Sequence, residues 1–372
     1  MAGDAPVGTI ATMSAGPSEQ LDHVRDQRIA WVTGLISPRV LLDEQPLAPG
    51  LEEFVLRGRS AVAEVLDRID DRLLVVVGPC SVHDPDAALD YAGRLSTAAR
   101  ELSDDLLVVM RVYFEKPRTT TGWKGLINDP HLDDTGDVNE GLRLARKLLL
   151  EVLALDLPVG CEFLDPITPQ YIADAVSWGA IGARTTESQI HRQLASGLSM
   201  PVGFKNRTDG NLAVAVDAVR AAAVPHTFAG IDLAGSPAVL HTRGNHDCHV
   251  ILRGGRAVPN YDAEGVGDAL ERLRAVGLPE RVVVDASHDN SGKDAGRQPG
   301  VAADIAAQIS GGNAALVGVM LESFIVAGRQ DLKDGVTPTY GQSITDACMS
   351  WEGTEEVLAG LAEAVRARRR VR

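Results

Sequence analysis

The stretch LLVVVGPC at residues 73–80 is a short apolar run rich in β-branched side chains, and glycine and proline interrupt it near its end. Such a run is typical of a strand that is buried on both faces of a parallel sheet. Eight further runs of this kind follow along the chain, at 106–113, 158–163, 180–184, 201–206, 226–231, 248–254, 282–288 and 315–323. We therefore predict a parallel α/β fold from residue 73 onward.

Helical patterns lie between most of these runs. Apolar residues at helical spacing predict a helix over 139–155, and a proline at its start favours a second helix over 299–310. Alternating strands and helices form a parallel sheet, and nine strands fit a closed (β/α)8 TIM barrel with one run left over. We expect an inserted β-hairpin between residues 226 and 254 to contain the extra run.

The composition excludes several classes of protein. The chain has 372 residues, of which 45% are hydrophobic, and a formal net charge of −15. An acidic surface repels nucleic acids and anionic membranes, so we expect neither as a partner. No apolar window is long enough to cross a bilayer, and the first twenty residues do not have the pattern of a secretory signal. The cysteines lie far apart without CxxC pairs, which favours a reducing cytoplasm: Cys80, Cys161, Cys248 and Cys348.

The chain is expected to have three parts. Residues 1–19 are predicted to be a flexible tail, residues 20–72 an N-terminal extension with a regulatory or oligomerisation role, and residues 73–372 the catalytic barrel. The extension contains a β-like piece at 27–33 and a helical piece at 60–69. It has too few apolar residues to fold alone, so it should pack on its own barrel or on a neighbour's. We therefore expect a homodimer or a homotetramer.

Four basic residues stand at the ends of predicted strands: Arg111, Arg184, Lys205 and Arg253. The C-terminal ends of barrel strands share one face, so these side chains should converge on one mouth. Lysine and arginine are rarely buried without partners, so either structural ion pairs or a bound anion is indicated. In so acidic a chain we favour an anionic ligand with phosphate groups. A loop after the Arg111 strand adds Lys116, Arg118 and Thr119.

Potential metal ligands also occur at predicted strand ends. Cys80, His288 and Glu322 end their runs, and Asp346 follows in a loop. Thiolate, imidazole and carboxylate groups together suit Mn, Fe, Co or Zn, although spacing alone does not select these four residues. A rival local set is His241, His246, Cys248 and His249. Cys248 and His249 would point to opposite faces of a strand, which argues against that set.

Seven blocks in order carry a family resemblance: LLVVVGPCSVHDP, VMRVYFEKPRTTTGWKGLINDPH, GARTTESQIHRQLASGLSMPVGFKN, HVILRGG, DASHDNSGK, GVMLES and YGQSITDAC. Together they closely resemble the microbial type I 3-deoxy-D-arabino-heptulosonate 7-phosphate (DAHP) synthases. The resemblance implies a TIM barrel with an N-terminal extension that condenses phosphoenolpyruvate with erythrose 4-phosphate, the first step of the shikimate pathway to aromatic amino acids.

The resemblance also implies roles for residues of this chain. It assigns a divalent metal ion, of Mn, Fe, Co or Zn type, to Cys80, His288, Glu322 and Asp346. It assigns phosphoenolpyruvate to Arg111, Lys116, Arg184, Lys205 and Arg253, with the Ala183 backbone and Glu162 nearby, and the phosphate of erythrose 4-phosphate to Arg118 and Thr119. We expect Lys116 to donate a proton to the aldehyde oxygen, with a pKa depressed by the arginines, and His288 and Glu162 to place a water molecule.

Two alternatives stay open beside this interpretation. One is the sister octulosonate 8-phosphate synthase, which uses a five-carbon sugar phosphate and which the KPRTT loop at 116–120 disfavours. The other is a catalytically silent barrel that serves as a regulatory subunit, but this would be expected to lack a metal ligand or a phosphate-binding cation. Relatives bind a feedback amino acid near residues 164–171 and 195–201, where Ser199, Pro166 and Pro169 do not distinguish phenylalanine, tyrosine and tryptophan. Arg207 stands where the family usually has glycine.

Overall fold

The computed structural model describes residues 26–118, 122–256, 258–332 and 336–371. The predicted tail at 1–19 lies outside the described residues, as does Thr119. The chain divides into two compact units, residues 1–35 and residues 36–372. The second unit contains every regular helix and strand of the described chain.

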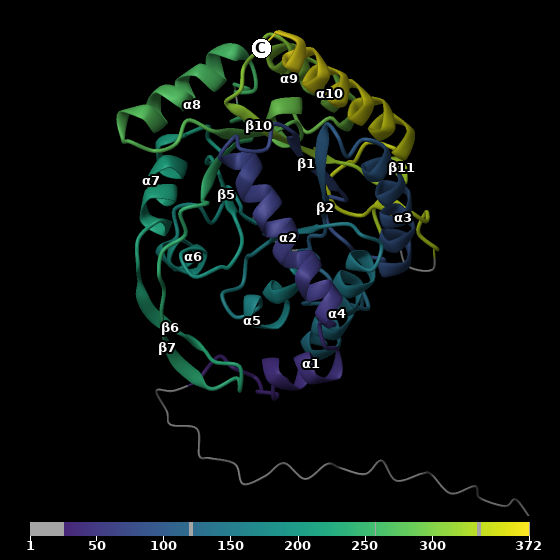
Figure 1. Cartoon of the computed structure of the whole chain (residues 1–372). Helices are drawn as coiled ribbons and strands as arrows, with labels where there is room; N and C mark the ends of the chain where they lie inside the picture. The colour runs from purple at the N-terminus through teal and green to yellow at the C-terminus, as the bar shows by residue number, and fades with distance from the viewer. Residues whose placement is uncertain (1–25, 119–121, 257, 333–335, 372) are drawn as a thin grey trace, which may run out of the picture. The chain divides into compact units, whose positions relative to one another are not determined.

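Eight parallel strands close into a barrel in the order β1-β10-β9-β8-β5-β4-β3-β2 (Figure 1). The predicted TIM barrel is therefore confirmed. The strands are short, as expected for runs of four to seven buried residues. Their bounds are β1 (Leu73–Gly78), β2 (Leu106–Arg111), β3 (Val159–Glu162), β4 (Trp178–Ile181), β5 (Val202–Lys205), β8 (His249–Leu252), β9 (Val282–Asp285) and β10 (Leu316–Glu322).

The helices surround this barrel, and the helices predicted at 139–155 and 299–310 are confirmed within two residues at each end. Several begin at a side-chain cap; for example, the Asp84 carboxylate accepts hydrogen bonds from the first backbone N–H groups of α3. No helix of the described chain is both long enough and apolar enough to cross a membrane. The helices are α1 (Pro38–Glu44), α2 (Pro49–Leu66), α3 (Pro85–Glu101), α4 (Val138–Leu153), α5 (Pro169–Ile172), α6 (Gln189–Ala195), α7 (Ala213–Ala222), α8 (Ala263–Ala275), α9 (Gln298–Ser310) and α10 (Trp351–Val371), with 3₁₀ turns η1 (Ala173–Ala175), η2 (His288–Ser291) and η3 (Ala295–Arg297).

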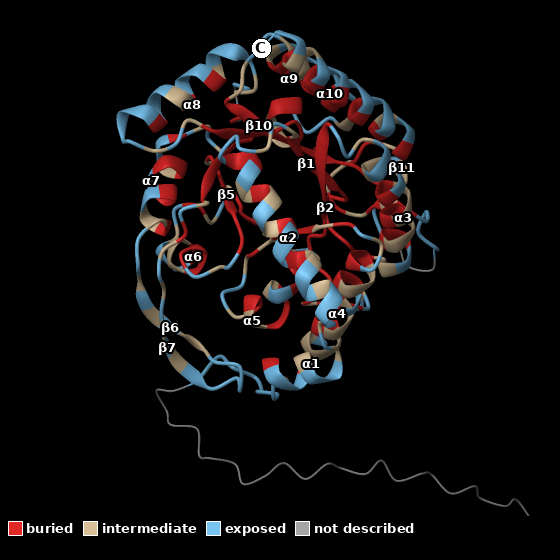
Figure 2. Cartoon of the chain, viewed as in Figure 1, coloured by how far each residue is buried: buried red, intermediate tan, exposed pale blue. Residues whose placement is uncertain are grey.

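The extra apolar run forms the hairpin that the sequence predicted. Strands β6 (Thr227–Ile231) and β7 (Pro237–His241) pair antiparallel with each other and not with the barrel. Their residues are exposed or half-buried, whereas every residue of β1 is buried (Figure 2). A second small pair, β11 (Val326–Arg329) and β12 (Gln342–Ser343), also lies outside the barrel.

Helix α2 of the extension covers the interior of the barrel at one end. Its Val62, Val65 and Leu66 belong to the same apolar cluster as inward-facing residues such as Leu74 and Val76. Because α2 packs against the core at the start of β1, the opposite end, where the strands finish, stays available for a site.

The β-like piece predicted at 27–33 is wrong: residues 26–35 form a turn followed by irregular chain, and almost all of them are exposed. A strand needs a neighbour that pairs with its backbone groups, and no strand pairing involves these residues in the described chain. The last helix, α10, carries a cluster of basic residues in its last turn, Arg368, Arg369 and Arg370. Its basic cluster is structural, because Arg369 forms ion pairs with both Asp71 and Asp105.

Arg146 on α4 joins the extension to the loops around the barrel. Its guanidinium is fully buried and binds both carboxylate oxygens of Asp174, at 2.7 and 2.8 Å. It also donates to the carbonyl oxygens of Gln45, at 2.7 Å, and of Tyr171, at 3.0 Å. One side chain thus ties together the α1–α2 connection, α4 and the segment after β3.

Replacing Arg146 by alanine should lower the free energy of unfolding by about 3 kcal/mol, because two buried carbonyl groups and a carboxylate lose their donor. Arg143 provides a matched control on the same helix, since it pairs with Glu44 at the surface. Its alanine variant should change stability by less than about 1 kcal/mol. Urea unfolding of both variants measures the difference; equal losses would contradict a special role for Arg146.

Candidate active site

A polar cavity lies where the barrel strands end. Arg111 is the last residue of β2, Glu162 of β3 and Lys205 of β5, and Arg253 directly follows β8. The structure brings most of the predicted substrate-binding and catalytic residues together around this cavity: Arg111, Lys116, Glu162, Ala183, Arg184, Lys205, Arg253, His288 and Asp346. The convergence follows from the parallel barrel, in which all strands finish on one face.

Two predicted residues are not brought to the cavity. Arg118 is exposed, donates through Nε to the carbonyl oxygen of Trp123 at 2.9 Å, and does not line the cavity. Thr119 lies outside the described residues. Both belong to the loop after β2, so their expected contact with the sugar phosphate stays a prediction.

Most cations of the cavity already face a carboxylate. Arg111 Nη2 lies 2.7 Å from Glu322 Oε1, and Lys205 Nζ lies 2.9 Å from Asp285 Oδ2. Arg253 pairs with Asp289, and Lys116 with Asp346. Structural ion pairs, the alternative weighed at the sequence level, are thus present. Arg184 differs, since its guanidinium only donates to the carbonyl oxygen of Pro117 at 3.4 Å.

Arg111 is held from several sides. Its guanidinium is buried, donates to the carbonyl oxygens of Pro79 and Cys80 at 3.1 and 3.2 Å, and lies over the ring of Tyr113, 3.9 Å from the centroid. Together with the Glu322 ion pair, these contacts hold the Arg111 guanidinium in one orientation, so that its positive charge faces the cavity.

A glycine gives the Glu162 carboxylate its room. A Cβ atom at residue 182 would lie 2.1 Å from Glu162 Oε1, so only glycine permits this approach of the β4 end to the carboxylate. Gly182 itself lines the cavity next to Ala183 and Arg184. The sequence Gly182-Ala183-Arg184 thus places two backbone positions and the Arg184 guanidinium beside the Glu162 carboxylate.

Three predicted metal ligands meet beside the cavity. One ligand atom from each of Cys80, Glu322 and Asp346 lies within 4.8 Å of the others, and this is the one such group in the described chain. His288 Nε2 is 3.6 Å from Glu322 Oε1, while its Nδ1 is 2.8 Å from Asp285 Oδ2. A carboxylate behind a histidine is typical of metal-binding imidazoles. The thiol, imidazole and carboxylate set therefore fits a divalent transition metal.

The electrostatics of Cys80 agree with that fit. Burial, together with the carboxylates of Glu322 and Asp346, raises the pKa of its thiol to about 11 against the opposing effect of Lys116. A thiol with such a pKa becomes a ligand only when a cation stabilises the thiolate. The backbone N–H of Cys80 also donates to Cys348 Sγ at 3.4 Å.

The expected depressed pKa of Lys116 is wrong. Burial alone would lower it, but Cys80, Asp346 and Glu322 raise the pKa above its usual value. Lys116 Nζ lies 2.7 Å from Cys80 Sγ and 2.8 Å from Asp346 Oδ2, so its nearest neighbours are acidic groups and not arginines. The side chain is therefore held as an ammonium ion, the form that donates a proton.

The sequence reasoning missed Asp285. It is fully buried, pairs with Lys205 and His288, and accepts hydrogen bonds from the backbone N–H and hydroxyl of Ser287. Burial would raise the pKa of Asp285, but His288 and Lys205 hold it well below its usual value. Its signal was its place as the last residue of β9; the predicted strand ran three residues further, to His288, which begins the turn η2.

Glu115 was also missed. It is buried, burial raises its pKa to about 8, and its carboxylate accepts hydrogen bonds from the backbone N–H groups of Leu164 and Asp165, at 3.3 and 3.1 Å. Glu115 directly precedes Lys116, so the loop that contains Lys116 is attached to the segment after β3. No motif in the sequence marks this contact.

The rival metal set does not assemble. His249 is buried inside the barrel, where its Nε2 accepts a hydrogen bond from Trp178 Nε1 at 3.2 Å and burial lowers its pKa to about 3. His241 lies on the hairpin and contacts the Thr227 hydroxyl. Arg207 pairs with Glu187 and Asp209, and it does not line the cavity. Its charge is therefore compensated away from the site.

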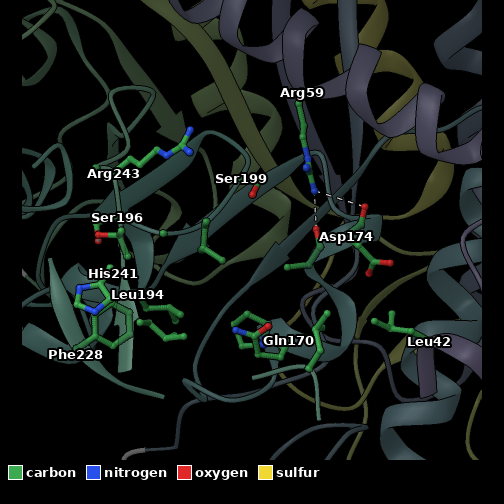
Figure 3. Close-up of a pocket in the computed structure, with 18 residues that line it drawn as sticks. Leu42, Arg59, Gln170, Asp174, Leu194, Ser196, Ser199, Phe228, His241 and Arg243 are labelled. Atoms are coloured by element: carbon green, nitrogen blue, oxygen red, sulfur yellow. Dashed lines mark hydrogen bonds between the residues drawn. The ribbon is translucent and has the colours of Figure 1, made fainter. Parts of the chain in front are cut away.

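A second cavity of about 740 Å³ lies between the extension, the segment after β3, α6 and the hairpin (Figure 3). Leu194, Phe228 and Leu240 contribute apolar walls, and Gln170 and Ser199 contribute polar ones. Arg59 of α2 lies at its edge and donates to the carbonyl oxygen of Ala173 at 2.7 Å. Pro169 and Ser199, from the predicted feedback region, line this cavity, whereas Pro166 does not.

Comparisons with known proteins match this architecture. Residues 55–359 match the DAHP synthetase I family. The Escherichia coli (strain K12) protein "Phospho-2-dehydro-3-deoxyheptonate aldolase, Phe-sensitive" is 55% identical over 344 residues, covering 92% of this chain and 98% of that protein. A "Phospho-2-dehydro-3-deoxyheptonate aldolase" of Corynebacterium glutamicum is 56% identical over 358 residues, with coverage of 94% and 97%.

A solved structure shares the fold closely. The structure of the aldolase of the same name from Francisella tularensis SCHU S4 superposes with a TM-score of 0.89 at 50% identity, covering 91% of this chain and 99% of that chain. The chain belongs to the DAHP synthetase I family.

Proposed function

We propose that this chain condenses phosphoenolpyruvate with D-erythrose 4-phosphate to give DAHP and inorganic phosphate, the reaction of EC 2.5.1.54 that begins the shikimate pathway. The observation that carries this proposal is a cavity lined by six lysine and arginine residues that adjoins a thiol–carboxylate group at the open mouth of the barrel. The basic cavity matches a small substrate that has a carboxylate and a phosphate group. The thiol–carboxylate group matches a second substrate whose aldehyde needs polarisation.

We propose that Cys80, His288, Glu322 and Asp346 hold a divalent ion of Mn, Fe, Co or Zn type. The ion would supply Lewis-acid polarisation of a carbonyl oxygen. The proposal is supported by the mutual approach of three of these ligands and by the carboxylate behind His288. Lys116 contacts two members of the set, so its ammonium and the ion would share one group of acidic side chains.

The protein groups then have separate tasks. Arg111, Arg184, Lys205 and Arg253, with the Ala183 backbone, would bind the carboxylate and phosphate of phosphoenolpyruvate. Its carbon 3 attacks the aldehyde carbon, and Lys116 protonates the aldehyde oxygen. Water placed by His288 and Glu162 adds to carbon 2 and gives up one proton, which replaces the proton donated by Lys116. The new hydroxyl loses its second proton to the leaving phosphate as it becomes the ketone carbonyl and the bond from carbon 2 to the bridging oxygen breaks. Arg118 and Thr119 are the proposed ligands of the sugar phosphate.

The two alternatives are less well supported. A silent regulatory barrel would be expected to have lost part of the site, whereas this chain retains every predicted metal ligand and the five predicted phosphoenolpyruvate-binding cations, and those five cations line one cavity. A sister synthase that uses a five-carbon sugar phosphate is disfavoured by membership of the DAHP synthetase I family.

We also propose that the second cavity binds an aromatic amino acid as a feedback inhibitor. Its apolar walls suit an aromatic ring, and Gln170, Ser199 and the nearby Arg59 suit the amino and carboxylate groups. The name of the Escherichia coli relative states sensitivity to phenylalanine. The cavity lining by itself does not distinguish phenylalanine from tyrosine or tryptophan.

We also propose that the chain forms a homodimer or a homotetramer, that it has three parts, and that it is located in the cytoplasm. A homodimer or homotetramer is supported by the exposed apolar side chains of the extension, since Trp31 is 79% and Val32 84% exposed. The division at 1–19, 20–72 and 73–372 stays a prediction. A cytoplasmic location is supported by four buried cysteines without disulfide bonds.

The reaction is tested by incubating the purified enzyme with phosphoenolpyruvate and erythrose 4-phosphate and measuring phosphate release. We expect that EDTA abolishes turnover and that Mn, Fe, Co or Zn restores it. The reason is that the proposed metal ion would polarise the aldehyde oxygen. A five-carbon sugar phosphate should be a poor substrate. Activity that persists after complete removal of metal would contradict the proposed site.

Replacing Lys116 by methionine should reduce kcat by about 10²- to 10⁴-fold, since the ammonium proton donor is lost. Metal content, measured on the same preparation by elemental analysis, should stay intact. Lys147→Met provides a matched control, because Lys147 lies at the surface of α4 beside Glu151. Substantial activity in the Lys116 variant would rule out its role as donor.

Replacing Leu240 by arginine should abolish feedback inhibition without loss of basal turnover, because a long charged side chain would fill the second cavity. Val239→Arg is the control: its neighbouring position on β7 points to the other face, is 63% exposed and does not line the cavity. Inhibition curves with phenylalanine, tyrosine and tryptophan measure both variants. If the two behave alike, the inhibitor binds elsewhere.

A further inference from the structure

Lys293 lies at the active-site cavity, although neither the strand-end argument nor the family resemblance assigned it a role. It lines the same cavity as Arg184 and Arg253. It also lines an adjoining cavity with His288 and Glu322, beside the proposed metal ligands. Lys293 is exposed, and it borders both the proposed binding site of phosphoenolpyruvate and the proposed metal ligands.

The backbone holds Lys293 in an unusual conformation. Its φ angle is +63°, in the left-handed region that side chains other than glycine and asparagine rarely adopt. The N–H of Lys293 donates to the carbonyl oxygen of His288 at 2.6 Å, which closes the loop after β9 into a tight ring. Residues in such conformations concentrate at functional sites, where surrounding contacts hold them. The position of Lys293 is thus coupled to that of His288.

The charges in the cavity point to a task for this lysine. Arg111, Lys116, Lys205 and Arg253 each face a carboxylate that compensates part of their charge. In the described chain the ammonium of Lys293 has neither an ion pair nor a hydrogen-bond partner. Arg184 and Lys293 are therefore the cavity cations without an acidic partner, and a substrate with a carboxylate and a phosphate needs such uncompensated charge.

We propose that Lys293 is a further substrate-binding residue whose ammonium binds the phosphate group of phosphoenolpyruvate, together with Arg184. This role rests on the proposed function of the cavity. Lysine suits the task because its flexible stem presents a point charge that can follow the phosphate group. The tight ring at 288–293 places Lys293 at the same cavity as the cations that are held by carboxylates.

The decisive variant is Lys293→Asn, which removes the charge and keeps a residue that tolerates the left-handed backbone. Calorimetric titration with phosphoenolpyruvate in EDTA measures binding to the full-length protein without turnover. We expect about tenfold weaker binding for Lys293→Asn, and affinity close to that of the wild type for Lys293→Arg. In steady-state kinetics with metal, the KM for phosphoenolpyruvate should rise while that for erythrose 4-phosphate is unchanged.

Arg297→Gln is the matched control. Arg297 lies four residues further along the chain, its side chain is 72% exposed, and it does not line the active-site cavity. Its binding constant for phosphoenolpyruvate should equal that of the wild type. The thermal midpoint of Lys293→Asn should also be unchanged, which separates loss of binding from loss of structure.

Different failures have different meanings. Wild-type affinity of Lys293→Asn for phosphoenolpyruvate overturns the role of the lysine, while the proposed function stands if the wild type turns over. A rise of KM confined to erythrose 4-phosphate also overturns the assignment to phosphoenolpyruvate. A wild-type protein that neither binds phosphoenolpyruvate nor turns over overturns the proposed function, and the role of Lys293 with it.

Discussion

Compensation of buried charge by two carboxylates is the interaction on which the barrel mouth depends. Glu322 pairs with Arg111 and lies beside Cys80 and Asp346, and Asp285 pairs with Lys205 and His288. A buried cation without such a partner would be strongly destabilising, and a buried carboxylate alone equally so. The pairs therefore permit several fixed charges to face one small cavity before any substrate arrives, so that little reorganisation is needed when it binds.

The loops around the mouth connect the two cavities. Glu115 attaches the chain next to Lys116 to the backbone at Leu164 and Asp165, and that segment continues into α5 at the wall of the second cavity. Arg146 joins the same segment to the extension through Asp174. A ligand in the second cavity would thus contact elements that share hydrogen bonds with the loop containing Lys116, which gives inhibition a physical route to the cavity at the strand ends.

Much of the architecture was predictable because it depends on local pattern. Short β-branched runs that alternate with amphipathic helices predicted the barrel, and the excess of one run predicted the hairpin at β6 and β7. The strand-end cations converged because parallel strands finish on one face. The prediction of a β-like piece at 27–33 was wrong because a strand also needs a partner. Its local pattern suits a strand, but the described chain has no partner strand for it.

The sequence by itself determined the order of strands and helices, the residue types at the mouth and, through seven motifs, the family. Only the tertiary structure decided which groups are neighbours: Lys116 meets Cys80 and Asp346 and so keeps its proton, whereas arginine neighbours had been expected. It likewise showed the contacts of Asp285 and that no acidic partner of Lys293 occurs among the described residues. Such contacts join loops that are far apart along the chain, so the charge around a side chain depends on distances in space that no local pattern encodes.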